Sequence, residues 1–352
     1  MTRTDSVVLG LGGVGSAALH HLAKRGVDCL GVEQFAVGHD RGSSHGESRA
    51  IRKAYFEHPA YVPLLRRAYE LWDELAVDAG VPLLRRTGVL QVGPPGGVVV
   101  RGVRQAAVQH GLDVQTLGAG AVAERFPGFA VPPGDVALFE SDAGWLDATA
   151  CVRAHVDGAT RRGAVVWEET GARGWVRDGA DLLLSTDRGD VRCRRLLVAA
   201  GPWASRHLPL PTSVLRKTLH WFEAAAPDTP VWLYERPGGV FYGFPSVGGV
   251  LKAAEHSGGQ AADPDAVDRR VGDADRAGLS AFLEAWRPDV GAPVRDRVCL
   301  YTMSTDGHFR MGQLPHEPAV RYVAGLSGHG FKFTAVLGEL LAGEAPLVNP
   351  LI

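Results

Sequence analysis

Long apolar runs are missing from this sequence of 352 residues. No stretch reaches the roughly 20 apolar residues that a membrane-spanning helix requires. The first apolar strand begins so close to Met1 that we expect no signal peptide, and neither an internal repeat nor a low-complexity tract is present. These absences predict a cytoplasmic globular protein with no membrane partner.

A strong excess of charge and an ordered set of cysteines are missing too. The formal net charge is -2, which gives no sign of a nucleic-acid partner. Cys29, Cys151, Cys193 and Cys299 have neither disulfide-like nor metal-like spacing, so we expect a reduced compartment and no bound metal. What remains is ordinary for a globular enzyme, with 45% hydrophobic and 22% charged residues in a chain long enough for two domains.

A glycine-rich turn near the N-terminus is the strongest single motif. The valine-rich run Ser6–Leu9 is typical of a buried parallel strand, and it leads directly into Gly10–Gly15, a G-x-G-x-x-G turn. Apolar residues then recur at helical spacing as far as Gly26, and a second apolar run, Cys29–Val32, ends at Glu33. The order is that of a strand–turn–helix–strand unit.

Each part of this unit has a physical reason to bind a dinucleotide. Gly10 permits the tight bend, Gly12 lets the backbone approach a pyrophosphate, and Gly15 lets the helix pack against the strand. The helix N-terminus attracts phosphate charge, and the Glu33 carboxylate can accept both hydroxyls of a ribose. The acid favours FAD or NAD over NADP. A purely structural strand–helix–strand unit is the alternative.

A long polar loop and a pair of arginines follow. Residues Phe35–Ser48 are too many for an ordinary connection, and loops of this length are usually functional or disordered. Arg49 and Arg52 stand three residues apart, so we expect them to share one helical face or to converge from one turn. They form either a solvated basic patch or an anion clamp for the cofactor or a carboxylate substrate.

The rest of the chain alternates helices with strands and predicts an α/β fold. Helices are expected over Tyr61–Ala79, Val98–Gly111, Asp147–Gly163, Leu279–Trp286 and Phe331–Leu341. Strands are expected over Arg86–Gly93, Val136–Leu146 (strand, then turn), Ala164–Glu168, Leu182–Thr186, Arg194–Ala200, Val298–Tyr301 and Arg321–Leu326. Short aromatic-rich strands between Leu215 and Trp286 indicate an antiparallel sheet. We therefore expect a Rossmann-like cofactor domain from residues 1–82, 142–212 and 299–352, and an antiparallel-sheet substrate domain from residues 83–141 and 213–298, with the site at their seam.

Five ordered segments resemble the FAD-dependent amine oxidases around monomeric sarcosine oxidase and N-methyltryptophan oxidase, in the D-amino acid oxidase superfamily. The segments are GLGGVGSAALHHLAKRG with Glu33, GSSHGESRAIRKAY, VFYGFPSVGGVLKAAEH, VCLYTMSTDGHF and AGLSGHGFKF. The resemblance covers nearly the whole chain and implies a glutathione-reductase-type flavoprotein fold. It also implies bound FAD, contacted by Gly10, Gly12, Gly13, Val14, Gly15, Glu33, Gln34, Ser43, Ser44, Arg49, Cys299, Leu300, Gly328, His329, Gly330, Phe331 and Lys332.

The resemblance gives one cysteine a special role. Taken alone, a cysteine on a strand is a small packed hydrophobe. The context Cys299-Leu300-Tyr301-Thr302, however, matches the family cysteine that holds FAD through an 8α-thioether. The other three cysteines have no such context, and we interpret them as structural.

Two cations are implied at a substrate carboxylate. Lys332 in GHGFKF matches the family lysine that lies by the flavin and pairs with this group, and Arg52 matches its second partner. A guanidinium fixes orientation, while a lysine supplies a compact charge. A surface lysine is the alternative for Lys332.

The remaining implied residues surround the amine and the oxygen site. Lys252 matches the lysine that promotes reaction with O2, because a fixed positive charge favours superoxide-like character in the transition state. His256 matches a histidine over the substrate, the alternative being a partly buried histidine satisfied by a neighbour. The set is completed by Arg49 at the flavin ring, by the aromatic walls Tyr242 and Tyr301, and by Leu233, which we expect to contact the substrate side chain.

The resemblance implies a monomeric oxidase of a small secondary or cyclic amino acid, such as sarcosine, another N-methyl amino acid or a pipecolate-like imino acid. The products would be an imine and, from O2, hydrogen peroxide. The alternatives are a flavin dehydrogenase or imine-forming enzyme with another electron acceptor, a non-catalytic flavin-binding protein, and an NAD-dependent enzyme. Ser44 stands where sarcosine oxidases often carry histidine, and the sequence stops soon after the last helix. The pocket shape, and with it the substrate, therefore does not follow from the resemblance, whereas flavin attachment and the carboxylate clamp do.

Overall fold

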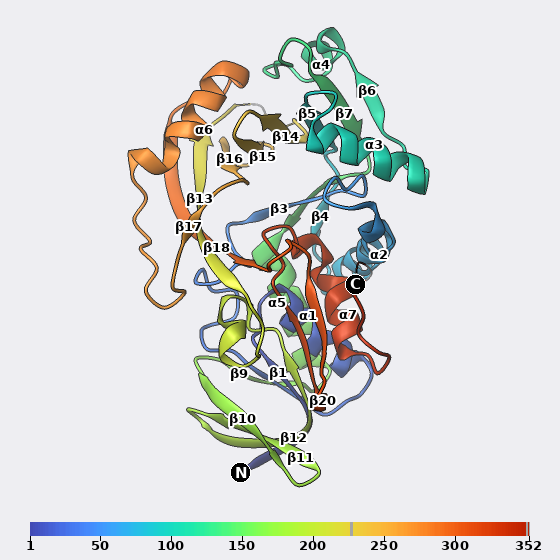
Figure 1. Cartoon of the computed structure of the whole chain (residues 1–352), viewed down its shortest axis with the longest axis vertical. Helices are drawn as coiled ribbons and strands as arrows, with labels where there is room; N and C mark the ends of the chain where they lie inside the picture. The colour runs from blue at the N-terminus through green and yellow to red at the C-terminus, as the bar shows by residue number, and fades with distance from the viewer. Residues whose placement is uncertain (226–227, 350, 352) are drawn as a thin grey trace.

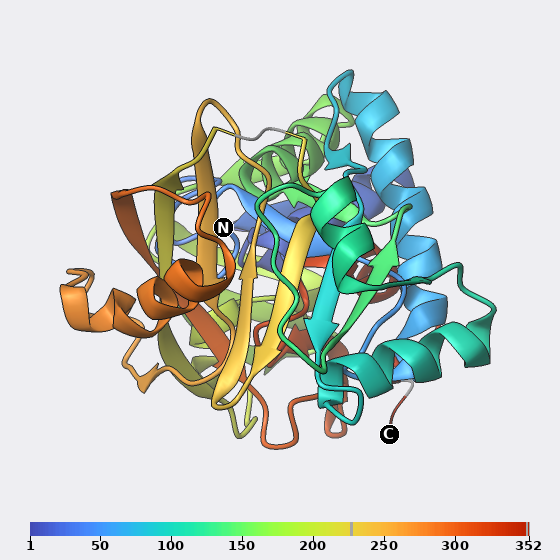
Figure 2. The same ribbon diagram turned by 90° about the horizontal axis from the view of Figure 1, so that it is seen from above.

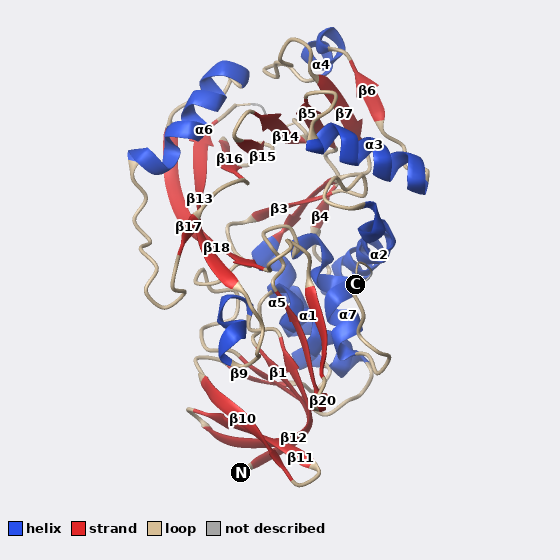
Figure 3. Cartoon of the chain, viewed as in Figure 1, coloured by secondary structure: helices blue, strands red, loops and turns tan. Residues whose placement is uncertain are grey.

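The computed structural model describes residues 1–225, 228–349 and 351, which form two large β-sheets with helices packed around them (Figures 1 and 3). One sheet carries the parallel strands and the other is mainly antiparallel. The mixed α/β fold class predicted from the sequence is confirmed. Within the described residues, no helix is both long enough and apolar enough to cross a membrane.

The first sheet has a parallel centre. Its order is β10-β11-β12-β1-β2-β9, with β20 paired to β12 and β19 paired to β20. The β1 strand pairs in parallel with β2 on one side and β12 on the other, so the ends of all three meet at one edge. The strands are β1 (Thr2–Leu9), β2 (Cys29–Val32), β9 (Val165–Trp167), β10 (Ala172–Asp178), β11 (Asp181–Thr186), β12 (Gly189–Val198), β19 (Arg310–Leu314) and β20 (Glu317–Ala324).

Four helices cluster beside this sheet: α1 (Gly13–Lys24), α2 (Val62–Ala79), α5 (Ala148–Arg161) and α7 (Thr334–Ala342) (Figure 1). The α1 and α7 helices cross closely, because a Cβ placed on Gly338 would lie 2.4 Å from the Cβ of Ala17. The α2 helix ends where the sequence predicts, with Gly80 in the left-handed conformation. The last helix begins at Thr334, after a 3₁₀ turn over Phe331–Phe333, rather than at Phe331 as expected.

The second sheet has the order β17-β13-β16-β15-β14-β5-β7-β6, with β18 paired to β13. Its pairs are antiparallel except β5 with β14, which departs from the sequence prediction. Seen from above in Figure 2, α6 (Asp273–Trp286), α3 (Val98–His110) and α4 (Ala119–Arg125) lie over its outer face. The strands are β5 (Val89–Gly93), β6 (Gln115–Leu117), β7 (Val136–Glu140), β13 (Ser213–Glu223), β14 (Val231–Arg236), β15 (Gly239–Gly243), β16 (Val250–Glu255), β17 (Gln260–Ala261) and β18 (Pro293–Met303).

The two faces of the second sheet have different partners. On the outer face, Trp232 stacks on Phe282 of α6 at an interplanar angle of 20°. Since side chains alternate along a strand, Leu233 faces the other way, toward the first sheet. This inner face carries most of the side chains that the sequence places near the substrate.

A small sheet of β3 (Ser48–Ile51), β8 (Gly144–Asp147) and β4 (Leu84–Arg85) lies between the two large sheets (Figure 1). Arg49 therefore lies on a strand, and Arg52 directly follows it. The expectation of one shared helical face was wrong, because extended pairing with β8 replaces the turn at this point. The domain boundaries stay a prediction; β18 runs without a break across the border proposed between residues 298 and 299.

Candidate functional site

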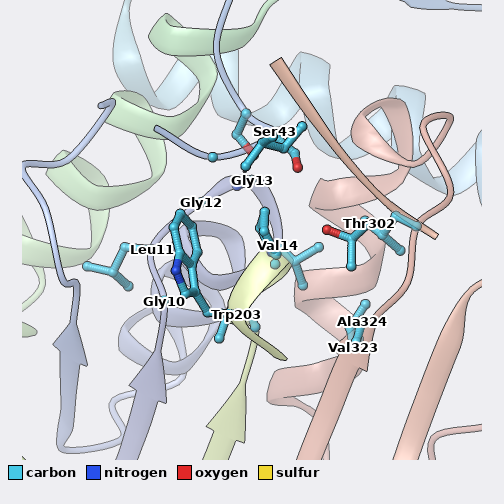
Figure 4. A pocket seen from close by; sticks show the side chains of 18 of the residues that line it. Gly10, Leu11, Gly12, Gly13, Val14, Ser43, Trp203, Thr302, Val323 and Ala324 are labelled. Atoms are coloured by element: carbon cyan, nitrogen blue, oxygen red, sulfur yellow. Dashed lines mark hydrogen bonds between the residues drawn. The ribbon is translucent and has the colours of Figure 1, made fainter. Parts of the chain in front are cut away.

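A cavity of about 270 Å³ opens at the carboxyl ends of the parallel strands. Its walls come from the glycine turn, the loop after β2, the turn after β12, the end of β18 and the turn after β20. Figure 4 shows the glycine turn on one side of the cavity and Thr302, Val323 and Ala324 on the other. The residues predicted for FAD that line it are Gly10, Gly12, Gly13, Val14, Glu33, Gln34, Ser43, Ser44, Arg49, Leu300, Gly328, Gly330 and Phe331, together with the predicted wall Tyr301.

The glycine turn has the geometry that its sequence demands. Gly10 has φ +87°, in the left-handed region that favours glycine. A Cβ on Gly15 would lie 1.7 Å from the carbonyl oxygen of Gly10. The helix can therefore pack this close to the strand only if position 15 is glycine. Gly12, by contrast, faces only the Ser44 hydroxyl, 3.3 Å from its ideal Cβ position, so its backbone is open toward the cavity.

Glu33 is buried at the end of β2 and fixes the turn. One carboxylate oxygen accepts the backbone N–H of Leu11 at 2.7 Å, and the other accepts that of Phe35 at 3.0 Å. The ring nitrogen of His39 lies 3.5 Å from the second oxygen. Each oxygen has a further lone pair, so the carboxylate can hold these partners and still accept a hydroxyl group.

The donors around the cavity fit a group that carries phosphates and hydroxyls. The N-cap residue of α1 is Gly12, which has no capping side chain, and the first turn holds no acidic residue. The Ser44 hydroxyl accepts from the N–H of Gly13 at 3.0 Å, and no side-chain charge neutralises the positive end of the helix dipole. The hydroxyl groups of Ser43, Thr302 and Thr334 are buried and lack a hydrogen-bond partner. All three residues line the cavity. A dinucleotide pyrophosphate with its ribose groups would supply the missing acceptors and donors.

The strand register of the second sheet brings the predicted substrate-side residues onto one face. Leu233 pairs with Tyr242, and Tyr242 pairs with Ala254. On β16, Lys252 lies opposite Trp221 of β13. On the other side of β13, Cys299 and Tyr301 of β18 lie opposite Lys217 and Leu215, which belong to the same face as Trp221. These side chains come from four strands, so no local pattern in the sequence could have grouped them.

Cys299 is buried where the loop before β3 meets this face. Its sulfur lies 3.6 Å from Nη2 of Arg49 and 3.8 Å from the carbonyl oxygen of Ser43. Its neighbour Leu300 lines the cavity. The loop packs directly on the sheet, because a Cβ on Gly46 would lie 2.5 Å from Cδ1 of Leu219.

Lys252 is buried beneath the same loop. Its ammonium donates to the carbonyl oxygen of Gly46 at 2.8 Å and to that of Ser48, and it lies 4.4 Å from the ring centroid of Phe244. Burial holds the pKa of this lysine well below its usual value. The arrangement keeps a compact cation on the inner face, next to the strand that carries Arg49.

Arg52 and Lys332, the two predicted carboxylate partners, converge on one aromatic ring. The Arg52 guanidinium carbon and the Lys332 ammonium lie 5.2 Å and 5.1 Å from the ring centroid of Tyr55. Both cations are buried. Burial and the charge of Arg52 together lower the pKa of Lys332 to about 7, against the opposing effect of Glu57.

Glu57 is a site residue that the sequence did not reveal. Both of its carboxylate oxygens accept from Nη2 of Arg52, at 2.9 and 2.8 Å. Burial alone would raise the pKa of Glu57, but Arg52 and Lys332 hold it below the usual value. Nε of Arg52 is buried without a partner, so this arginine keeps a free donor.

Two neutral histidines complete this wall. His329 donates from Nε2 to the carbonyl oxygen of Gly307 at 2.9 Å, so its Nδ1 accepts from the hydroxyl of Tyr55. Nδ1 of His256 lies 3.3 Å from the hydroxyl of Tyr301. Burial lowers the pKa of His329 to about 4 and that of His256 to about 3. The ring of His329 thus faces Tyr55 rather than the cavity, although the adjacent residues Gly328 and Gly330 line the cavity.

Other residues that line the cavity could not be identified from a sequence motif, because the only pattern near them is the strand that precedes them. Trp203 follows β12 in a 3₁₀ turn over Gly201–Arg206, and its ring is drawn beside the glycine turn in Figure 4. Trp72 of α2 supports the opposite wall, since its indole N–H donates to the carbonyl oxygen of Lys332 at 3.0 Å. Its ring stacks on Phe331 at an interplanar angle of 9°.

Comparisons with known proteins agree with this geometry. The family described as FAD dependent oxidoreductase matches residues 5–344. Monomeric sarcosine oxidase from Bacillus sp. (strain B-0618) is 37% identical over 357 aligned residues, which cover 97% of this chain and 92% of that protein. N-methyl-L-tryptophan oxidase from Yersinia pestis (strain Pestoides F) is 35% identical over 347 residues, with coverages of 96% and 94%.

Solved structures share the fold at lower identity. NikD, an unusual amino acid oxidase essential for nikkomycin biosynthesis, superposes in its open form with a TM-score of 0.87 at 24% identity, over 97% of this chain and 93% of that chain. Glycine oxidase from Geobacillus kaustophilus superposes with a TM-score of 0.83 at 22% identity, with coverages of 97% and 94%. The chain therefore belongs to the FAD dependent oxidoreductase family, among the amine oxidases related to monomeric sarcosine oxidase and N-methyl-L-tryptophan oxidase.

Proposed function

We propose that this FAD-dependent protein oxidises a small secondary or cyclic amino acid to an imine and reduces O2 to hydrogen peroxide. The observation that carries this proposal is the pair of buried cations, Arg52 and Lys332, each about 5 Å from the ring centroid of Tyr55. FAD, when bound, accepts a hydride equivalent from the substrate and passes the electrons to O2. Every other task falls to the residues of the chain.

The cofactor would lie along the cavity. The backbone of the glycine turn and the N-terminus of α1 would hold the pyrophosphate, and Glu33 would accept from a ribose. The predicted contacts of Gln34, Ser43, Ser44 and Gly328 come from the other walls. Val14 and Phe331 would cover apolar parts of the group.

The substrate carboxylate would bind between Lys332 and Arg52. Arg52 can offer its unpartnered Nε without first releasing Glu57, or it can exchange one carboxylate for the other. Charge-assisted hydrogen bonds of this kind are roughly twice as strong as neutral ones. The pair would orient the substrate with its amine toward the inner face of the second sheet.

The amine would bind in its neutral form. Arg49, Arg52, Lys252 and Lys332 bring positive charge to the site, only partly offset by carboxylates such as Glu57, so a positive charge on the substrate amine is disfavoured. His256 is neutral and adds no charge, and Tyr242, Tyr301 and Leu233 form the walls. A neutral amine already carries the lone pair that drives C–H cleavage, so no further base is needed.

We also propose that FAD is attached through Cys299. The sulfur would bond to the 8α-carbon of the flavin while the thiol and that carbon each lose a proton, and O2 would take up the two electrons as hydrogen peroxide. Arg49 donates from Nη2 to the sulfur at 3.6 Å, which would hold the sulfur in place for this bond. Acid precipitation of the protein tests the link: the yellow colour should stay in the pellet, whereas a yellow supernatant would contradict attachment.

Oxygen would react beside Lys252, whose buried charge stabilises developing negative charge on O2. A monomeric state and a cytoplasmic location belong to the same proposal. Both are sequence predictions that size-exclusion chromatography and cell fractionation can test.

Peroxide release tests the proposed activity. Sarcosine, other N-methyl amino acids and pipecolate should each be tried with a peroxidase-coupled assay, with dimethylamine as a control that lacks the carboxylate. We expect peroxide from at least one amino acid and none from the control. Flavin reduction by an amino acid without peroxide in air would instead assign the electrons to another acceptor.

A further inference from the structure

Lysine is scarce in this chain, which makes each one informative. The lysines are Lys24, Lys53, Lys217, Lys252 and Lys332, and arginine supplies the rest of the basic residues. Lys24 and Lys53 reach solvent, with side chains 49% and 24% exposed, and both pair with carboxylates. The other three are buried. Lys252 and Lys332 belong to the proposed site, but Lys217 has no role so far.

Lys217 belongs to the same face of the second sheet as these residues. It lies on β13 directly opposite Cys299 on β18, and residues paired in this way project to the same side of a sheet. Its ammonium lies 5.6 Å from the ring centroid of Tyr301. It donates to the carbonyl oxygen of Ser257, and to that of Gly258 at 3.3 Å.

The turn after β16 is folded around this side chain. Gly258 and Gly259 have φ +65° and +122°, in the left-handed region that favours glycine. A Cβ on Gly259 would lie 3.0 Å from Cδ of Lys217. A glycine at position 259 therefore lets the turn pack against the aliphatic part of the lysine side chain. His256 directly precedes this turn, and its ring reaches the hydroxyl of Tyr301 at 3.3 Å.

The charge of Lys217 has no carboxylate partner within ion-pair distance among the described residues. The titratable groups that face Lys217 are Glu255 at the end of β16, His256 just after it, and Cys299 and Tyr301 of β18. Its neighbour on β13, Arg216, is paired with Asp275. Burial lowers the pKa of Lys217 to about 8, and Glu255 and Cys299 oppose that change. An unpaired buried ammonium is costly, and in such cases a function often accounts for it.

We infer that Lys217 is a positioning residue of the substrate site, whose ammonium holds the Ser257–Gly259 turn and thereby sets the place of His256 against Tyr301. The inference rests on the proposed oxidase function, because His256 and Tyr301 are there assigned to the wall around the amine. The charged form makes charge-assisted bonds to the two carbonyl groups, and the neutral amine makes weaker ones. The wall should therefore loosen as Lys217 loses its proton.

Inhibitor binding as a function of pH tests this inference. Methoxyacetate carries the carboxylate but no amine, so its own charge is constant above neutral pH, and its affinity can be followed by the flavin absorbance. The Lys217→Met substitution should weaken binding roughly ten-fold at pH 7. The ratio of wild-type to variant affinity should then approach one by pH 9.5, because the wild-type lysine has become neutral. Deprotonation of Lys332 affects both proteins and cancels in this ratio.

A merely structural role gives a different result. If Lys217 only fills space, the ratio of affinities stays constant across this pH range, and the inference is overturned. Lys24→Met removes an exposed lysine and should leave the affinity unchanged at every pH. Lys217→Arg keeps a positive charge that does not titrate in this pH range. The ratio of its affinity to that of Lys217→Met should therefore stay constant up to pH 9.5.

A measurement on the unaltered protein covers the case in which Lys217→Met does not fold. With ¹³Cε-labelled lysine, NMR should show few resonances, and replacing each of the other four lysines by arginine in turn identifies its resonance. The remaining resonance, that of Lys217, should titrate near pH 8 and respond to methoxyacetate. A Lys217 resonance at the ordinary lysine value of about 10.4 would overturn the inference. Oxidase activity is measured separately, so its absence would contradict the proposed function and not this titration.

Discussion

The cofactor cavity and the inner face of the second sheet differ in what they are made of. The cavity has many glycines, the N-terminus of α1 and several uncharged hydroxyl groups in its walls, and Glu33 is the carboxylate among its lining residues. The inner face carries the buried charges of Lys217 and Lys252, and the adjoining substrate site adds those of Arg52 and Lys332 beside Tyr55. The first region recognises by shape and the second by charge, so the two should fail in different ways when they are altered.

The largest expected effect is at Gly15. In Gly15→Ala the new Cβ would lie 1.7 Å from the Gly10 carbonyl oxygen, so the turn must open, at a cost above the roughly 1–3 kcal/mol typical of overpacking. We expect loss of bound FAD, measured as flavin per protein. Gly120→Ala, where nothing lies within 4 Å, is the matched control and should keep its flavin. Full flavin in Gly15→Ala would refute recognition by shape.

The next effect is at Arg52. Arg52→Ala removes a carboxylate partner and leaves Glu57 buried without its main counter-charge, and breaking such a pair costs roughly 3–5 kcal/mol. We expect kcat/KM to fall at least about 100-fold while flavin content stays normal. Lys53→Ala, one residue along and partly exposed, should change kcat/KM little. If Arg52→Ala also lost its flavin, the claim that the cofactor cavity and the substrate site respond independently to substitution would be contradicted.

A smaller and more selective effect is expected at Lys252. Lys252→Met removes a buried charge from the inner face, so reoxidation by O2 should slow on the order of 100-fold. Anaerobic reduction by substrate should change much less, because Arg52 and Lys332 are intact. Stopped-flow absorbance of the flavin separates the two half-reactions. Equal slowing of both would contradict the oxygen assignment.

The smallest effect is a pH dependence of stability that both regions share. Burial lowers the pKa of His21, in the last turn of α1, to about 4 and that of His45, in the loop next to Ser44, to about 3. It lowers the pKa of His329 to about 4 and that of His256 to about 3 at the substrate site. Each histidine is neutral when folded but takes up a proton on unfolding below about pH 6.5, so stability is full above that pH and is lost as the pH falls toward 4. We expect Tm to be roughly 5 °C lower at pH 5 than at pH 7.

Two variants can divide this pH effect between the regions. His21→Gln and His256→Gln each remove one such histidine, and each should flatten the dependence of Tm on pH. A flattening in only one of them would show that acid unfolds one region first. An unchanged profile in both would contradict the linkage.

The same contrast explains what could be predicted from the sequence. The cofactor region follows from a local motif, since the glycine spacing and Glu33 lie within one continuous stretch and the structure keeps them together. Its other walls, such as Trp203, come from distant turns that carry no such pattern. Glu57 was missed because its significance appears only when the guanidinium of Arg52 is placed in space.

The substrate side shows a second limit of sequence reasoning. The spacing of Arg49 and Arg52 predicted one helical face or one turn, but pairing with β8 decides the local conformation. Lys217 left a trace only in composition, as one of few lysines among many arginines. Its place opposite Cys299 depends on strand register, which cannot be read from either strand alone.

The short strand β3 also bears on the size of substrate that fits. Arg49, next to the Cys299 sulfur, and Arg52, in the carboxylate cluster, are separated by three steps of nearly extended chain, roughly 10 Å. Pairing with β8 holds this backbone extended, so the distance between the flavin end and the acid end of the site is fixed. We expect β-amino acid homologues, with one more methylene between acid and amine, to be oxidised far more slowly than their α-amino counterparts in the same peroxide assay.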